Sequence, residues 1–139
     1  MPVPPALRAL LETRDQQRCV YCLTTEENCG LRMHVDHIIP EAVDGPTTAE
    51  NTCLVCFSCN VAKAAQQSAV DPVSGARVPL FHPVQQRWRD HFVWSADKTR
   101  IIGVTARGRA TVEALHMNNP TVERARRRWV AAGWHPPTD

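Results

Sequence analysis

The sequence lacks several features that would decide its class at once. No apolar run in its 139 residues approaches the length of a membrane span. The N-terminal stretch lacks the continuous apolar core of a signal peptide, and there is no internal repeat or low-complexity tract. The net charge of +2 is too small to indicate nucleic-acid binding by itself. These absences exclude membrane-spanning and secreted classes and lead us to expect a soluble cytoplasmic protein.

Disulfide scaffolds are also excluded, because six cysteines are too few for one at this length. Their spacing points to zinc instead. Cys19 and Cys22 form one C-x2-C pair, and Cys56 and Cys59 form another, with 33 residues between the two pairs. Two such pairs complete a tetrahedral zinc shell. Because Cys53 and Cys56 have the same spacing, the pattern alone leaves Cys53 and Cys59 as alternatives.

Apolar periodicity and turn residues predict an α+β fold. We expect a first segment, residues 1–70, with an N-terminal helix and a small strand–loop–strand–helix module, and a second, residues 71–139, that packs on or beside it. The second begins with a turn-rich stretch and continues with a hairpin and two helices. The predicted helices cover 4–17, about 58–65, 107–117 and 120–132, and the predicted strands cover 31–39, 52–57, 92–94 and 99–104.

Charge is divided unevenly between the two segments. Residues 1–70 contain five basic and eight acidic side chains, whereas residues 71–139 contain eleven and six. Arg124, Arg127 and Arg128 fall on the outer face of the last predicted helix. A basic tail beside a metal-binding module suits a nucleic-acid partner, but solvated arginines that pack their stems on the surface are an equally good reading.

Between the cysteine pairs lie residues with the chemistry that phosphodiester hydrolysis needs. Asp36 and Asn60 offer oxygen ligands of the kind that Mg²⁺ prefers. His37 can remove a proton from water near neutral pH. Ideal strand alternation would point Asp36 and His37 to opposite faces, so a shared site requires the strand to end or bend there, which Pro40 favours.

These residues resemble the HNH endonuclease family with its zinc-clamped ββα-metal fold. The resemblance covers about residues 15–67 and consists of Asp-His-Ile-Ile-Pro, an Asn fourteen positions after the His, and Cys-x2-Cys-Asn-x2-Lys. It implies that His37 is the general base and that Asp36 and Asn60 hold one catalytic divalent ion, Mg²⁺ or Mn²⁺. Asn51 would brace the loop and orient the base.

The resemblance also implies that Cys19, Cys22, Cys56 and Cys59 bind a structural Zn²⁺, which decides the cysteine register. Lys63 and His34 become candidate phosphate contacts, together with the three arginines of the last helix. The expected partner is double-stranded DNA, with RNA as an alternative, and the expected protein is a bacterial or phage monomer or homodimer. An Asn at position 60, where many members have His, implies a weaker ligand set.

Two other functions fit parts of the pattern. A zinc-stabilised module could bind DNA without cleaving it, although such a module has no chemical reason to keep Asp36, His37 and Asn60 together. A thiol redox or metal-sensing protein could use the same cysteine pairs. DNA cleavage separates the first alternative from an endonuclease, and tight stoichiometric zinc with unreactive thiols would exclude the second.

Overall fold

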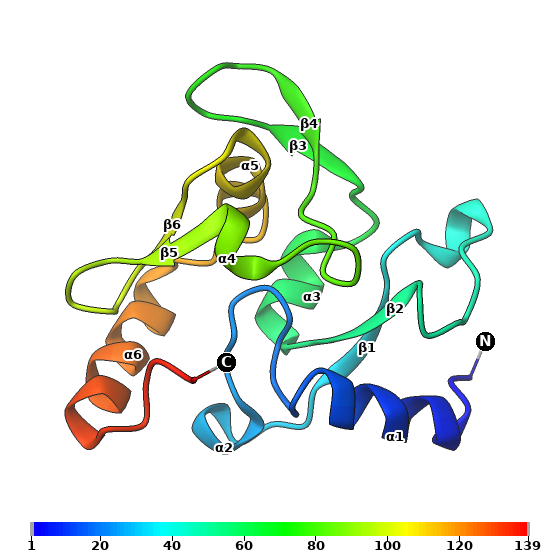
Figure 1. The fold of residues 1–139 in the computed structure, drawn as a ribbon, viewed down its shortest axis with the longest axis horizontal. Coiled ribbons are helices and arrows are strands. Elements are labelled where there is room, and N and C mark those ends of the chain that lie inside the picture. The colour runs from blue at the N-terminus through cyan, green and yellow to red at the C-terminus, as the bar shows by residue number, and fades with distance from the viewer. Residues whose placement is uncertain (1, 139) are drawn as a thin grey trace.

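The computed structural model describes residues 2–138 and has a mixed α+β fold (Figure 1). Within these residues each sheet consists of two antiparallel strands. This architecture confirms the predicted fold class: an N-terminal helix, small sheets, a four-cysteine cluster and C-terminal helices.

Helix α1 (Pro5–Arg14) begins the chain and lies beside the first sheet. Proline at its first position suits a helix start, because that N–H has no partner within the helix. The helix is shorter than the predicted 4–17, since Gln16 and Gln17 have positive φ angles, which end a right-handed helix. Asp15 then accepts a 3.0 Å hydrogen bond from Leu54 N, which ties the end of α1 to the sheet.

The central ββα unit consists of β1 (His34–His37), β2 (Thr52–Val55) and α3 (Phe57–Lys63). Strand β1 pairs with β2 so that Asp36 lies opposite Cys53. The predicted strand 31–39 is cut short after His37, because the next backbone amides donate to Asn51 instead of to the ladder. Short helices α2 (Glu26–Cys29) and η1 (Glu41–Val43) lie in the connections.

The start of α3 differs from the prediction that Ser58 caps it. Cys56 is the cap residue, and its sulfur accepts a 3.4 Å hydrogen bond from Cys59 N. The same short segment therefore starts the helix and turns two sulfurs toward one point.

The second half contains two hairpins and three helices. Strands β3 (Ser68–Val70) and β4 (Arg77–Pro79) enclose the predicted turn-rich stretch, and the predicted hairpin is formed by β5 (Phe92–Trp94) and β6 (Ile101–Gly103). The helices are α4 (Trp88–His91), α5 (Ala106–Ala114) and α6 (Pro120–Ala132). Helix α5 is shorter than predicted, whereas the bounds of α6 agree with the prediction.

Helix α5 packs directly onto β6 and onto the end of α4 because a glycine at each contact allows a close approach. A Cβ atom at Gly103 would lie 2.3 Å from Arg109 N, and one at Gly108 would lie 2.1 Å from the carbonyl oxygen of His91. A larger residue at either position would force the helix away from the sheet.

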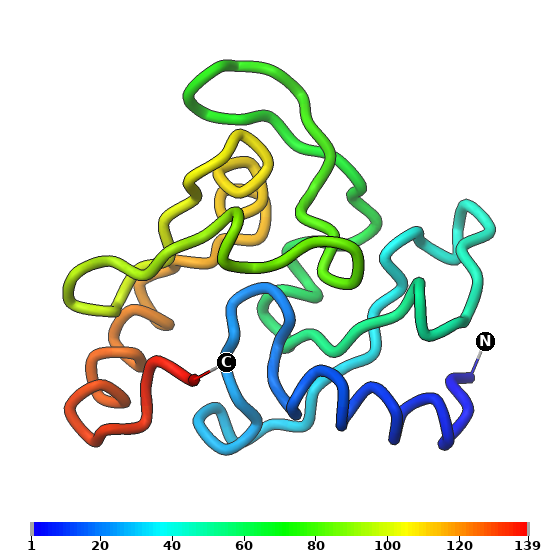
Figure 2. Tube along the Cα trace, in the orientation of Figure 1, coloured from blue at the N-terminus to red at the C-terminus, as the bar shows by residue number. Residues whose placement is uncertain are grey.

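One hydrophobic cluster contains side chains from both halves of the chain, from Leu11 to Met117. Trp88 Nε1 donates a 2.7 Å hydrogen bond to the carbonyl of Tyr21, across the two halves. Figure 2 shows the last residues returning to the loop before α2, where Arg18 donates to the carbonyl of Thr138 at 2.8 Å. The expected boundary at residue 70 coincides with the end of β3, and β4, which pairs with that strand, lies beyond it.

Candidate functional site

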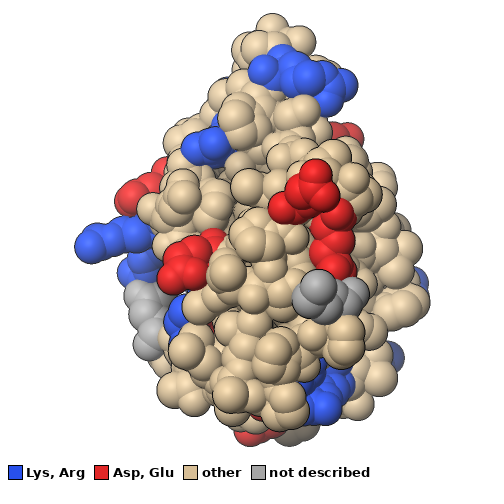
Figure 3. All heavy atoms as spheres, turned by 90° about the vertical axis from the view of Figure 1, so that its right-hand side faces the viewer, with Lys and Arg blue, Asp and Glu red and all other residues tan. Residues whose placement is uncertain are grey.

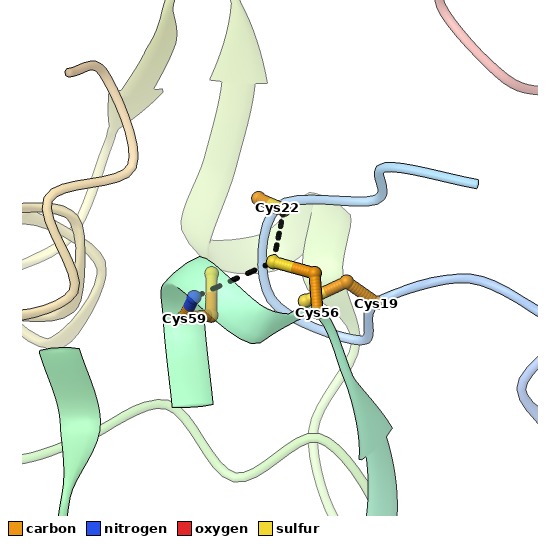
Figure 4. A group of neighbouring side chains, drawn as sticks. All are labelled: Cys19, Cys22, Cys56 and Cys59. Carbon is orange, nitrogen blue, oxygen red and sulfur yellow. Dashed lines mark hydrogen bonds between the residues drawn. The ribbon is translucent and has the colours of Figure 1, made fainter. Parts of the chain in front are cut away.

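Four cysteine sulfurs meet at the base of the ββα unit. Cys19 and Cys22 come from the loop after α1, Cys56 from the end of β2 and Cys59 from the first turn of α3 (Figure 4). Their sulfurs all lie within 4.8 Å of one another, and Cys22 and Cys56 are 3.6 Å apart. A tetrahedral zinc ion with Zn–S bonds of ~2.3 Å holds its sulfurs about 3.8 Å apart, so these cysteines fit zinc.

The buried thiols of the cluster shift one another's pKa values in different directions. Burial raises the pKa of Cys19, hydrogen bonds with the other three thiols raise the pKa of Cys59, and hydrogen bonds from Cys19, Cys56 and Cys59 lower the pKa of Cys22. Cys53, the alternative ligand, faces Asp36 across the ladder and does not belong to the cluster.

Asp36 is buried between β1 and α3, where it contacts a buried lysine. Lys63 Nζ lies 2.9 Å from Asp36 Oδ2, and the lysine side chain is 2% exposed. The contact is an ion pair without hydrogen-bond alignment, since Oδ2 has no hydrogen-bond partner. Lys63 also donates a 3.4 Å hydrogen bond to the carbonyl of His37. A phosphate contact by Lys63 would require this buried ammonium to become accessible.

His37 ends β1, and its ring faces the following loop. Its Nε2 lies 2.9 Å from Thr47 Oγ1, and its Nδ1 lies 3.8 Å from Glu41 Oε1. With Nε2–H donating to the threonine hydroxyl, the tautomer leaves the Nδ1 lone pair free to accept a proton. Strand β1 ends at His37, so strict strand alternation does not continue beyond the Asp36–His37 pair.

Asn51 holds the loop that follows His37. Its Oδ1 accepts from Ile39 N at 2.9 Å, and its Nδ2 donates to the carbonyls of Ile39 and Pro46 at 3.1 and 2.8 Å. These bonds fix residues 39–46 against the start of β2. Thr47 lies directly after the fixed segment, so the Asn51 bonds also set its position beside His37.

Asn60 lies on α3 and lines a hollow of about 410 Å³ together with His34. Asp36 and His37 are not among the lining residues of this hollow. Asn60 and Lys63 are three residues apart on one helix, which separates their Cβ atoms by about 5–6 Å. Of these two side chains, Lys63 is the one that contacts the Asp36 carboxylate, whereas Asn60 faces the hollow. The other lining residues are Val3, Arg8, Arg32, Met33 and Val35.

The three arginines of α6 lie in different surroundings. Arg128 lines a second hollow, of about 570 Å³, between α6 and the cysteine cluster. Arg127 lies 3.9 Å from the Glu123 carboxylate, and Arg124 is exposed. Among these side chains, Arg128 is the one that borders a concave surface.

Sequence reasoning missed three residues around these sites: Thr47 beside His37, Arg8 in the hollow with Asn60, and Arg126, which is fully buried. Thr47 and Arg8 stand at no recognisable spacing from the motif residues. Arg126 lies four residues after Val122 and three before Trp129, so helical spacing places it on the apolar face of α6, and this spacing could have identified it.

Figure 3 shows the face that includes η1 and the N-terminal end of α1. Acidic side chains gather in its middle, and basic side chains lie toward its top, the level of the β3–β4 hairpin, as well as at its left edge and near its bottom. A phosphate that approaches the loop after His37 therefore meets negative charge, which a bound cation would offset.

Comparison with known proteins agrees with this geometry. None of the helices in residues 2–138 combines the length and the apolar character needed to cross a bilayer. No curated protein matches the chain. The HNH endonuclease family matches residues 19–66, the segment from the first cysteine to just beyond α3. This segment includes the cysteine cluster and the ββα unit, and nucleic acid is the substrate class that the family implies. Residues 19–66 of this chain are an HNH endonuclease domain.

Proposed function

We propose that the chain is a metal-dependent endonuclease that hydrolyses phosphodiester bonds of double-stranded DNA. The observation that supports this most is the ββα unit of an HNH domain in which Asp36 and His37 end β1 and Asn60 faces β1 from α3. The cysteine cluster joins α3 to the end of β2, the strand that pairs with β1.

In this proposal Asp36 and Asn60 hold one divalent ion, Mg²⁺ or Mn²⁺. A carboxylate and an amide oxygen are ligands that such an ion prefers, and the ion would supply charge stabilisation at the scissile phosphate. Lys63 would share the Asp36 carboxylate with the ion, because the ammonium already lies 2.9 Å from it.

His37 is the proposed general base. Thr47 Oγ1 accepts a hydrogen bond from Nε2–H and holds the ring, so that Nδ1 takes the proton of the attacking water. Glu41, 3.8 Å from Nδ1, stabilises the imidazolium that forms. Asn51 acts through the loop and is a positioning residue. Breakage of the bond to the 3′-oxygen leaves 5′-phosphate and 3′-hydroxyl ends.

Zinc at the four cysteines has a structural role here, because every ligand position is filled by sulfur and none remains for substrate. For DNA contact we propose His34 at the hollow beside Asn60 and Arg128 beside the second hollow, with Arg124 and Arg127 as weaker contributors. A single chain has one such site, so a double-strand break would need two chains or two events.

Nicking of supercoiled plasmid tests the proposal. We expect zinc-loaded protein to nick DNA in Mg²⁺ or Mn²⁺, and His37→Ala to reduce the rate by about 10²–10⁴-fold. Equal inactivity of both proteins across metals and substrates would contradict the enzyme proposal.

One observation favours the second candidate, a module that binds DNA without cutting it. Lys63 neutralises Asp36 within the fold, as a cation would. If this pair replaces the ion, the protein should bind duplex DNA with the same affinity in the presence and absence of Mg²⁺, and should not nick it.

A further inference from the structure

The hollow beside Asn60 is completed by a residue outside the HNH domain. Arg8 belongs to α1, which precedes the matched segment 19–66, and it lines the same hollow as His34 and Asn60. The proposed site thus extends onto the N-terminal helix.

The guanidinium of Arg8 is anchored at one end and has no carboxylate within ion-pair distance among residues 2–138. Its Nη2 donates to the carbonyl of Met33, and its Nε is buried without a partner. The planar fork keeps further N–H donors for a ligand once Nη2 is fixed.

Nearby carboxylates are engaged elsewhere. Glu12, one turn further along α1, lies 3.7 Å from Arg32. Glu26 accepts a 2.8 Å hydrogen bond from Met33 N. No lining residue of the hollow is acidic, and Arg8, His34 and Asn60 line it, whereas the charge of Arg32, also at its edge, is offset by Glu12. This set of donors suits an anion.

We propose that Arg8 binds a backbone phosphate of DNA in this hollow, beside Asn60. This inference rests on the proposed function for the identity of the anion, and it assigns a contact to α1. Arginine suits the role because its fork can donate two parallel hydrogen bonds to phosphate oxygens.

The salt dependence of DNA binding tests this contact, because each phosphate contact contributes about 0.9 to the slope of log affinity against log salt. The parent is the His37→Ala protein, and the probe is a short fluorescein-labelled duplex in Mg²⁺ between about 50 and 200 mM NaCl. Arg8→Gln removes the charge but keeps a donor for the Met33 carbonyl. Arg32→Gln is the matched control, since it removes the same charge from the same hollow where Glu12 already offsets it.

We expect Arg8→Gln to weaken binding about tenfold and to reduce the slope by about 0.9, while Arg32→Gln and Arg8→Lys keep the parent slope. A folded Arg8→Gln protein with the parent slope would overturn the proposal, and so would an equal loss in Arg32→Gln. If Arg8→Gln fails to fold, Arg8→Lys provides the test. A salt slope for Arg8→Lys that falls below the parent slope, although the charge is retained, would overturn the phosphate contact.

A separate measurement of DNA cleavage by the wild-type protein distinguishes failure of the Arg8 contact from failure of the endonuclease proposal. Cleavage together with an unchanged slope in Arg8→Gln overturns the Arg8 contact alone. A reduced slope without cleavage by the wild type supports the contact and contradicts the endonuclease proposal.

Discussion

Asn51 and Asn60 are the same residue type in opposite surroundings. The Asn51 side chain is 6% exposed and makes three hydrogen bonds to the backbone of the loop after β1. The Asn60 side chain is half-buried, lines a hollow and makes no hydrogen bond with another residue in 2–138. One amide therefore stabilises structure, and the other is available to a ligand.

The same substitution at the two positions should have different effects. Asn51→Ala should lower the free energy of unfolding by about 2 kcal/mol, because it leaves buried backbone groups without partners. Asn60→Ala should leave the unfolding midpoint unchanged and abolish cleavage. Urea denaturation and the nicking assay measure both effects, and an unfolded Asn60→Ala protein would show that Asn60 has a structural role.

The resemblance to a known family made it possible to predict which motif side chains lie together. It did not predict which of these side chains are buried. Cys19, Cys22, Cys56 and Cys59 lie together as expected. Lys63 was expected to face phosphate and is buried against Asp36. Whether a long cationic side chain turns inward depends on a partner distant in sequence, here 27 positions away, and no local pattern reveals it.

Among the helices and strands, sequence predicts the bounds of an element best where capping residues mark both of its ends. Asn119 caps α6 by accepting from Val122 N at 2.9 Å, Pro120 is its first residue, and Gly133 follows its end with a φ of 80°. The β3–β4 hairpin was predicted only as a turn, because strands of three residues are too short to show a period of two.

The turn of that hairpin contains a carboxylate on which its attachment depends. Asp71 accepts from Ser74 Oγ at 2.7 Å and pairs with Arg109 on α5 through two bonds of 2.9 and 3.0 Å. The Arg109 hydrogen bonds hold the pKa of Asp71 well below its usual range. The ion pair thus links β3–β4 to α5.

Asp71 should therefore make stability depend on pH in the acid range. Because its pKa is depressed in the folded state, its contribution is present above the unfolded value of about 3.9 and is lost as the pH falls below it. Asp71→Asn should lower the denaturation midpoint at neutral pH, and its difference from wild type should shrink below about pH 4. Exposed Asp90→Asn is the control; a pH-independent difference for Asp71→Asn would contradict the ion-pair role.

At the level of the whole molecule, the two expected segments contribute to one hydrophobic core, and a buried arginine of the second lies near the cysteines of the first. Arg126 of α6 is fully buried and donates to the carbonyls of Thr99 and Met117. Burial lowers its pKa, and the nearby thiols of Cys22 and Cys59 act in the opposite direction. Zinc with four thiolates has a net charge of −2, which would compensate this arginine.

Zinc removal should therefore loosen α6 as well as the HNH domain. A strong chelator should unfold residues 19–66, since zinc binding contributes folding free energy, and should reduce amide-exchange protection in α6. Arg126→Met should make protection in α6 less sensitive to the chelator, with exposed Arg124→Met as the control. Unchanged protection in α6 after complete zinc removal would contradict this coupling.

The central claim is that Asp36, His37 and Asn60 act together on one phosphodiester bond. Single-turnover cleavage of an end-labelled duplex by zinc-loaded protein in Mg²⁺ tests it most directly. We expect 5′-phosphate and 3′-hydroxyl ends, loss of cleavage in Asn60→Ala, and a rate in His37→Ala lower by about 10²–10⁴-fold. Cleavage at the wild-type rate by the folded His37→Ala protein would contradict it.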